Sequence, residues 1–132
     1  MIRGSCLCGG VQYRINGPLF DALNCHRSMC RKAHGAPFRS RAGVKAADLE
    51  WVQGKELVTF YESSPGNRRG FCRVCGSPIV TAFRARPDCY GLPLGALDDD
   101  PRIAPRLHIH VASKAPWFKI TDDLPQMPDA PS

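Results

Sequence analysis

Four cysteines in two widely separated pairs have the residue type and spacing of a metal site. Cys6 and Cys8 lie one residue apart near the start of the chain, and Cys72 and Cys75 form a Cys-x-x-Cys pair in its middle. Thiolates at these spacings can bind one ion together, and two such pairs complete the tetrahedral sulfur shell that structural zinc prefers. The sequence therefore predicts one four-thiolate zinc site that ties the first strand to the middle of the chain.

A disulfide framework is the alternative use of these thiols. The chain has seven cysteines, an odd number, and it opens Met-Ile-Arg-Gly-Ser-Cys without the charged and apolar stretches of a secretory signal. We therefore favour metal over disulfides and expect a cytoplasmic protein. Glycines follow both pairs, and we expect each of them to adopt the positive φ that a tight curl around an ion demands: Gly9, Gly10 and Gly76.

A second pair of thiols lies among cationic side chains. Cys25 and Cys30 flank or adjoin Arg27, Arg31 and Lys32, close to the start of a short predicted helix. Positive charge and a helix N-terminus both favour thiolate, which can bind a metal, attack an electrophile or be oxidised. The same cations can hold the carboxylates of an anionic thiol such as glutathione. Two inert, buried cysteines are the bland alternative.

Length and charge limit the classes of protein that fit. The chain has 132 residues, enough for one compact domain, and a net charge of +6. Its arginines are scattered, without the interleaved aromatic residues that stack on bases, so nucleic-acid binding is disfavoured. No apolar run approaches the roughly 20 residues that span a bilayer, so we expect a soluble protein with no membrane partner. The sequence leaves the oligomeric state open.

Alternation of apolar and polar residues predicts a mostly β domain of short antiparallel strands with one or two short helical turns. The expected strands cover residues 11–15, 19–23, 38–42, 57–61, 79–82, 90–94 and 107–111, and residues 63–70 are expected to form a polar loop. Helical turns are expected over 28–34, capped by Ser28, and over 45–49. We expect a single domain over residues 1–125, followed by a Pro-rich segment, 126–132, that is an extended strap or a frayed tail.

Several other conspicuous residues have structural explanations. His108 and His110 are expected to share one face of a strand, with partly exposed imidazoles in packing or hydrogen-bonding roles. Trp51 and Trp117 are expected to be core or edge anchors. We expect Cys89 to be an unpaired thiol outside both cysteine groups. The three aspartates at 98–100 are expected to form a solvated turn and not a carboxylate site.

The chain resembles the glutathione-dependent formaldehyde-activating family, which shares its domain with the centromere protein V group. The resemblance is carried in order over about residues 3–125 by Gly-Ser-Cys-x-Cys-Gly, by the Cys-His step at Cys25 with Cys30-Arg-Lys, by Phe71-Cys-x-x-Cys-Gly-Ser and by Lys114-Ala-Pro-Trp. It implies a β-tent fold with a structural zinc on the residues matching Cys6, Cys8, Cys72 and Cys75. It also implies a carbon-sulfur lyase that forms S-(hydroxymethyl)glutathione from formaldehyde and glutathione.

One position departs from that family pattern. The fullest members carry a second zinc on Cys-His-Cys-x-x-Cys, and the middle cysteine of that motif is Arg27 here. Arginine cannot ligate a metal, and its charge opposes a nearby cation. Cys25 and Cys30 therefore make only a partial second site, and His34 or His26 is the candidate for a further ligand.

Two functions follow as hypotheses. The first is a lyase with a degraded second metal site, acting on a thiol adduct. In it Cys25 and Cys30 bind a metal or act directly, while Arg27, Arg31 and Lys32 hold the carboxylates of the adduct. The second is a non-catalytic, zinc-stabilised module that binds an anionic small molecule or a protein partner.

Overall fold

The structure is a computed structural model that describes residues 1–130, and strands dominate it. In chain order the elements are β1 (Ile2–Ser5), β2 (Gln12–Ile15), β3 (Phe20–Cys25), α1 (Ser28–His34), β4 (Arg39–Lys45), β5 (Leu49–Gln53), β6 (Val58–Ser64), β7 (Asn67–Cys72), β8 (Pro78–Phe83), β9 (Arg86–Pro93) and β10 (His108–Ile109). Short 3-10 turns cover Ala46–Asp48, Lys55–Leu57, Leu94–Ala96 and Val111–Ser113. The mostly β class expected from the sequence is confirmed.

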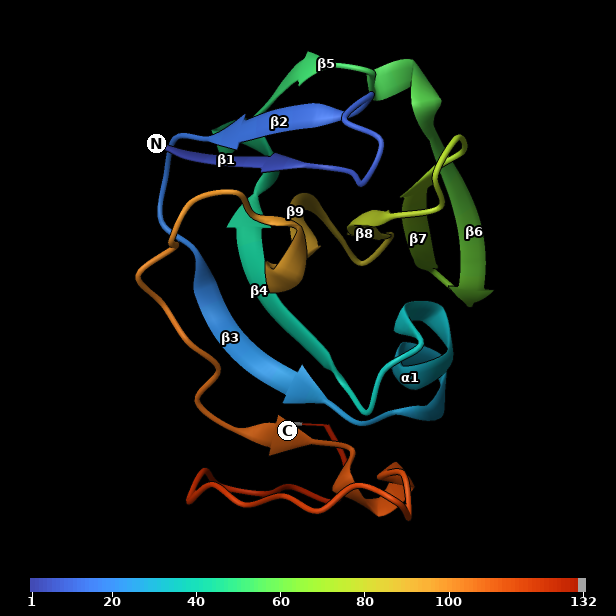
Figure 1. The fold of residues 1–132 in the computed structure, drawn as a ribbon, viewed down its shortest axis with the longest axis vertical. Coiled ribbons are helices and arrows are strands. Elements are labelled where there is room, and N and C mark those ends of the chain that lie inside the picture. Colours follow the sequence, from blue (N-terminus) through green and yellow to red (C-terminus); the bar gives the residue numbers. More distant parts are fainter. Residues whose placement is uncertain (131–132) are drawn as a thin grey trace.

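Two sheets make up the fold. The smaller has the strand order β1-β2-β5, and the larger has the order β10-β3-β4-β9-β8-β7-β6. All pairs are antiparallel except β10 with β3, which run parallel. In Figure 1 the small sheet lies at the top, β3 and β4 run below it, and α1 lies beside the start of β4, below β6 and β7.

The main core lies between the two sheets. Tyr13 and Ile15 of β2 point into it, as their alternation with Gln12 and Arg14 predicts, and they meet buried residues of β8 and β9 such as Ile79 and Leu92. Burial of each such side chain stabilises the fold by about 1.5–3 kcal/mol. Cys6 and Cys72 belong to the same cluster, so the predicted metal site is an extension of the core.

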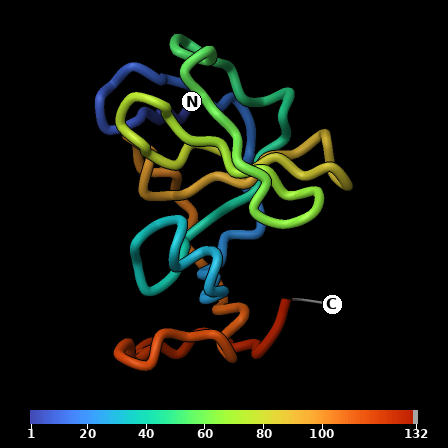
Figure 2. The backbone as a smooth tube through the Cα atoms, turned by 90° about the vertical axis from the view of Figure 1, so that its right-hand side faces the viewer, coloured from blue at the N-terminus to red at the C-terminus, as the bar shows by residue number. Residues whose placement is uncertain are grey.

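A smaller core supports the second pair of thiols. Leu23, Cys25, Cys30 and Ile109 are buried together, with Leu107 and Met127 packed against them. The chain after β10 crosses this cluster as a strap, because Met127 N–H donates to the carbonyl of His108 and Val111 N–H donates to that of Met127. Figures 1 and 2 both show this last segment at the bottom of the molecule, away from the small sheet. Through residue 129 the Pro-rich segment is therefore a hydrogen-bonded strap, while residues 131 and 132 lie outside the described part.

The expected polar loop over residues 63–70 is wrong, and the difference matters for the site. The segment belongs to β6 and β7, which form a hairpin around Pro65 and Gly66. Gly66 has a φ of 80°, which glycine adopts without the penalty that a Cβ brings. The two arginines at 68 and 69 hide the strand from a hydropathy pattern, because one is exposed and the other only half-buried. The hairpin directs Arg69 toward α1.

Other local expectations are corrected as well. The helix over 28–34 has the expected bounds, yet its N-cap is Arg27 and no side chain caps it, so Ser28 is the first helical residue and not the cap. The segment 45–49 forms a single 3-10 turn followed by β5. β1 and β5 were missed because neither shows a clean apolar alternation.

Two side chains lie where the sequence does not predict them. Trp117 is 70% exposed, so it is not a core or edge anchor, whereas Trp51 is half-buried against Tyr13. His108 is buried, not partly exposed, and His110 has left-handed backbone just after β10, which ends the shared strand face. Among the described residues, no helix has the length and apolar character needed to cross a membrane.

Candidate metal centre and thiol pocket

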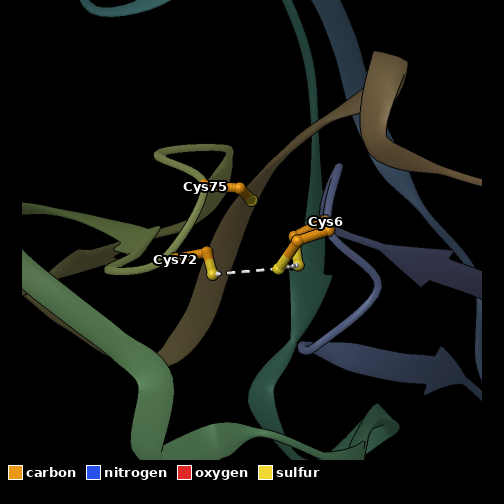
Figure 3. Close-up of side chains that lie close together, drawn as sticks. Cys6, Cys72 and Cys75 are labelled. Atoms are coloured by element: carbon orange, nitrogen blue, oxygen red, sulfur yellow. Dashed lines mark hydrogen bonds between the residues drawn. The ribbon is translucent and has the colours of Figure 1, made fainter.

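The four predicted zinc ligands come together at one place. The sulfur atoms of Cys6, Cys8, Cys72 and Cys75 all lie within 4.8 Å of one another. The Cys6 and Cys8 sulfurs are 3.5 Å apart, and those of Cys8 and Cys72 are 3.9 Å apart. Four sulfurs placed 2.3 Å from a tetrahedral zinc lie about 3.8 Å from one another, so the spacing fits that ion. Figure 3 shows the labelled Cys6, Cys72 and Cys75 facing the same space from two loops.

The backbone around the four thiols folds as two tight turns. Gly9 N–H donates to the carbonyl of Cys6, and Gly76 N–H donates to that of Cys72. Gly9 and Gly76 have φ of 77° and 79°, as expected, but Gly10 does not have positive φ. Leu7 N–H donates to the Ser77 hydroxyl at 2.9 Å, which joins the two turns.

Ser77 also forms a hydrogen bond with one of the four cysteines and favours its thiolate form. Its hydroxyl lies 3.3 Å from the sulfur of Cys75, and hydrogen bonds from the Ser77 side chain and backbone lower the pKa of Cys75 to about 5. Metal ligation requires the thiolate form, so this cysteine needs little rearrangement of protons when an ion binds. The donor set, its spacing and this hydrogen bond all fit zinc.

The second pair of thiols lies at the junction of β3 and α1. Cys25 ends the strand and Cys30 lies in the helix, and a hydrogen bond joins their sulfurs at 3.3 Å. Both are buried. Within residues 1–130, the tetrathiol is the one cluster of three or more metal-type ligands, so the fold does not bring His34 or His26 into ligand distance of both Cys25 and Cys30.

Arginine side chains surround this pair. Arg69 Nη2 donates to the Cys30 sulfur at 3.5 Å. The hydrogen bond with Cys25, followed by contact with Arg69 and the charge of Arg39, lowers the pKa of Cys30 to about 5. The pKa of Cys25 is raised, first by the bond to Cys30 and then by burial. The two thiols share a hydrogen bond, and contact with Arg69 favours the thiolate form of Cys30 over that of Cys25.

Arg39 is a buried cation without an acidic partner in the described chain. It is 5% exposed, its Nη2 donates to Thr81 Oγ1 at 2.9 Å, and its Nε has no hydrogen-bond partner within residues 1–130. Burial lowers its pKa to about 10. A buried guanidinium is costly unless anions compensate for it, so this position favours a negatively charged neighbour or ligand.

A cavity of about 320 Å³ opens beside these groups. His34, Arg39, Tyr61 and Arg69 contribute to its wall, together with apolar residues of β7 and β8. A second cavity, of about 590 Å³, shares His34 and Arg39 with the first and extends to Cys6. The two cavities connect the surroundings of the thiol pair with the edge of the tetrathiol. The charged side chains in the wall of the first are Arg39 and Arg69, whereas Asp98 also lines the second.

The cations expected from the sequence are not the ones in this wall. Arg27 is half-buried at the N-cap of α1, Arg31 donates to the carbonyl of Ser113, and Lys32 is exposed. Arg39 and Arg69 take their place beside the thiols. The alternation of Arg39 and Arg41 in an expected strand was a usable signal for a cationic strand face. No such signal identifies Arg69, because the sequence predicts a polar loop over residues 63–70.

A chain of buried polar groups lies behind Cys25. His26 Nε2 is 2.8 Å from His108 Nδ1, and His108 Nε2 is 3.0 Å from the Asp122 carboxylate. The His26 ring packs on Phe38 and Phe118, and its Nδ1 has no partner. Burial, followed by the nearby His108, lowers the pKa of His26 to about 4. This histidine is neutral at pH 7 and serves to position the strap.

Together the tetrathiol at the edge of two sheets and the arginine-lined pocket beside the thiol pair define a β protein with a candidate metal site and a candidate small-molecule site. The family model of the glutathione-dependent formaldehyde-activating enzyme matches residues 1–113. The chain belongs to this family. A Halomonas elongata protein named "Putative glutathione-dependent formaldehyde-activating enzyme" is 31% identical over 128 residues, covering 91% of this chain and 81% of that protein.

A solved structure is similar as well. The crystal structure of a Rhodobacter sphaeroides protein superposes with a TM-score of 0.62 at 30% identity, covering 78% of this chain and 97% of the other. The family and the mostly β fold expected from the sequence are confirmed.

Proposed function

We propose that the tetrathiol of Cys6, Cys8, Cys72 and Cys75 holds one zinc ion with a structural role. Four thiolates fill the coordination shell of zinc and leave no open position for a substrate. The ion would join the turn after β1 to the turn between β7 and β8, which are far apart in the sequence. Its contribution is to folding and not to a reaction step.

We propose further that the pocket beside Cys25 and Cys30 is the site of a carbon-sulfur lyase acting on the adduct of formaldehyde with a glutathione-type thiol. The observation that carries this proposal is the position of Arg69, whose guanidinium lines the cavity and contacts the Cys30 sulfur. A ligand in the cavity therefore meets the same guanidinium that contacts the Cys30 sulfur. The family to which the chain belongs supports glutathione as the thiol.

In this proposal two arginines bind the substrate and the two cysteines transfer a proton. Arg39 and Arg69 are placed to bind carboxylates of the thiol, since guanidinium matches carboxylate in charge and geometry. Addition of a thiol to formaldehyde requires the sulfur to lose a proton and the aldehyde oxygen to gain one. Cys25 and Cys30 already share one proton at 3.3 Å, and in this proposal they accept and return it.

The test measures the exchange of ¹³C-formaldehyde between its hydrate and the glutathione adduct by NMR, with zinc-loaded protein under anaerobic conditions. Wild type is expected to accelerate exchange above the spontaneous rate, and Cys30→Ser and Arg69→Met are expected to lose the acceleration. Arg68→Met is the matched control, because Arg68 is exposed and lies over the Phe60 ring, away from the pocket wall. A wild-type rate equal to the spontaneous rate contradicts the lyase.

The second candidate is a zinc-stabilised module that binds an anionic thiol without catalysis. One observation favours it: in the described part of the chain no third metal-type ligand joins Cys25 and Cys30. Glutathione would then raise the melting temperature through Arg39 and Arg69 while exchange stays at the spontaneous rate. The two measurements together separate the candidates.

A further inference from the structure

We infer that Cys25 and Cys30 form a redox-active dithiol, which closes to a disulfide by exchange with a small disulfide that carries carboxylates. The inference does not depend on lyase activity, since it concerns only the two sulfurs and the charges around them. Four observations support it: the spacing of the sulfurs, the local backbone, the position of the arginines and the separation of this pair from the metal cluster.

The spacing is already close to that of a bond. The two sulfurs lie 3.3 Å apart, and a disulfide needs about 2.05 Å. Closing that gap requires a shift of little more than 1 Å shared by two side chains. The thiols face each other from different elements, the end of β3 and the first turn of α1, so side-chain rotation and a small helix displacement can both contribute.

The local backbone permits such a displacement. α1 has seven residues, no side-chain cap at its N-terminus and one buried residue, Cys30. A short helix with few buried contacts opens at low free energy, which gives a reagent temporary access to sulfurs that are buried in the closed state. β3, in contrast, is paired on both sides, with β4 and β10, so Cys25 is the fixed member of the pair.

The arginines define which thiol attacks and which reagent fits. Arg69 contacts Cys30 and not Cys25 in the hydrogen-bond network, so Cys30 is the attacking thiolate. Arg39 and Arg69 line the adjoining cavity and attract a reagent with carboxylates. Oxidised glutathione, a disulfide with several carboxylates, meets both requirements.

The exchange has two steps in which atoms and electrons balance. The Cys30 thiolate attacks one sulfur of the reagent, forming a mixed disulfide and releasing one thiolate of the reagent. Cys25 then loses its proton to the released thiolate and attacks the Cys30 sulfur, which forms the Cys25–Cys30 disulfide and releases the second half of the reagent as a thiolate that takes a proton from water. The pair is oxidised by two electrons, and the reagent disulfide is reduced to two thiols.

The other cysteines make the pair distinguishable. Cys6, Cys8, Cys72 and Cys75 gather at the metal centre, where bound zinc would protect them, and Cys89 lies in β9, apart from both groups. Oxidation confined to Cys25 and Cys30 therefore leaves the metal content unchanged.

The experiment uses the full zinc-loaded chain in buffers with increasing ratios of oxidised to reduced glutathione, followed by acid quench, alkylation and peptide mass spectrometry. We expect a Cys25–Cys30 disulfide to form before Cys89 is modified, with zinc retained, and to revert when reduced glutathione is restored. Free, alkylated Cys25 and Cys30 throughout the series would overturn the inference. Release of zinc in step with oxidation would overturn it too, because the reacting thiols would then be metal ligands.

A matched variant tests the order of attack. In Cys25→Ser the mixed disulfide at Cys30 has no resolving thiol, so one glutathione per chain is expected to accumulate there. In Cys30→Ser no adduct is expected at Cys25, which lacks the contact with Arg69. An adduct on Cys25 in the second variant and none on Cys30 in the first would contradict the assigned roles, and zinc content and circular dichroism check that both variants fold.

Discussion

His26 and His108 share a buried hydrogen bond of 2.8 Å, between Nε2 of the first and Nδ1 of the second, although 82 residues separate them. Because His108 also contacts Asp122, the pair links three segments: the end of β3, β10 and the strap after it. His26 directly follows Cys25, so the bond holds the strand end that carries one thiol of the pocket. His108 therefore has the hydrogen-bonding role that the sequence suggests, and its partner is His26, a residue of the cysteine motif.

The first prediction tests this link. His108→Leu leaves Nε2 of His26 buried without a partner, and an unsatisfied buried polar group costs about 1–3 kcal/mol. Asp122→Asn keeps a hydrogen-bonding group at a partly exposed position, so its cost is expected to stay below about 1 kcal/mol. Urea unfolding of the two zinc-loaded variants measures the difference, and equal losses of stability would contradict the assigned role.

The second prediction concerns acid. Burial, reinforced by Arg39 and Arg69, lowers the pKa of His34 to about 4, below its usual value of 6.5. Between about pH 6.5 and pH 4 the unfolded chain binds a proton at His34 and the folded chain does not. The free energy of unfolding therefore has its full value above about pH 6.5 and decreases as the pH falls toward 4. One such group changes the unfolding free energy by up to ~1.4 kcal/mol per pH unit.

His34→Gln removes that dependence. The free energy of unfolding is measured for the zinc-loaded wild type and variant between pH 7 and pH 5. Any loss of metal at acid pH affects both proteins alike and cancels in the difference. We expect the stability difference between them to change with pH, in favour of the variant at the acid end. Parallel curves would show that His34 titrates equally in the folded and unfolded chain.

The third prediction concerns the metal. Cys72 is fully buried and central to both the core and the tetrathiol, so Cys72→Ser is expected to lose the bound zinc and to lower the melting temperature by at least ~10 °C. A chelator that removes the metal is expected to lower the melting temperature of the wild type as well. Cys89→Ser is the control and is expected to retain one zinc per chain. Two zinc ions per wild-type chain would point instead to a further site.

The sequence predicts the four-cysteine cluster because its signal is local. Spacing within each pair and the glycines after them are enough to assign Cys6, Cys8, Cys72 and Cys75, and the fold only has to bring the pairs together. The pocket wall carries no such signal. Arg39 lies beside the thiols because β4 pairs with β3, which places Arg39 opposite Cys25. Arg69 reaches them through the strand order β4-β9-β8-β7, and spacing along the chain shows neither relationship.

The cations next to the thiols in sequence lie outside the cavity wall for a related reason. Arg27, Arg31 and Lys32 adjoin the motif, yet a helix directs its side chains around an axis, and these three do not line the cavity. His108 illustrates the converse. Its apolar neighbours suggested a half-exposed strand, and the strap that buries it is formed by Pro-rich residues without strand propensity.

The last prediction separates binding from stability at Arg39. Arg39 is buried and forms no ion pair with a carboxylate within residues 1–130, so Arg39→Met, which keeps much of the volume and removes the charge, is expected to leave the melting temperature unchanged or to raise it. The same change removes a cation from the cavity wall. Glutathione is therefore expected to bind at least tenfold more weakly and to lose most of its effect on the melting temperature.

Two further variants complete this test by calorimetry and thermal shift. Arg69→Met is expected to weaken glutathione binding as Arg39→Met does, whereas Arg68→Met, one position along β7 and exposed, is expected to bind like wild type. If Arg39→Met lowers the melting temperature and leaves glutathione affinity intact, the guanidinium serves the fold through Thr81 and not the ligand. If both arginine variants retain full affinity, the thiol binds elsewhere than in the cavity beside Cys30.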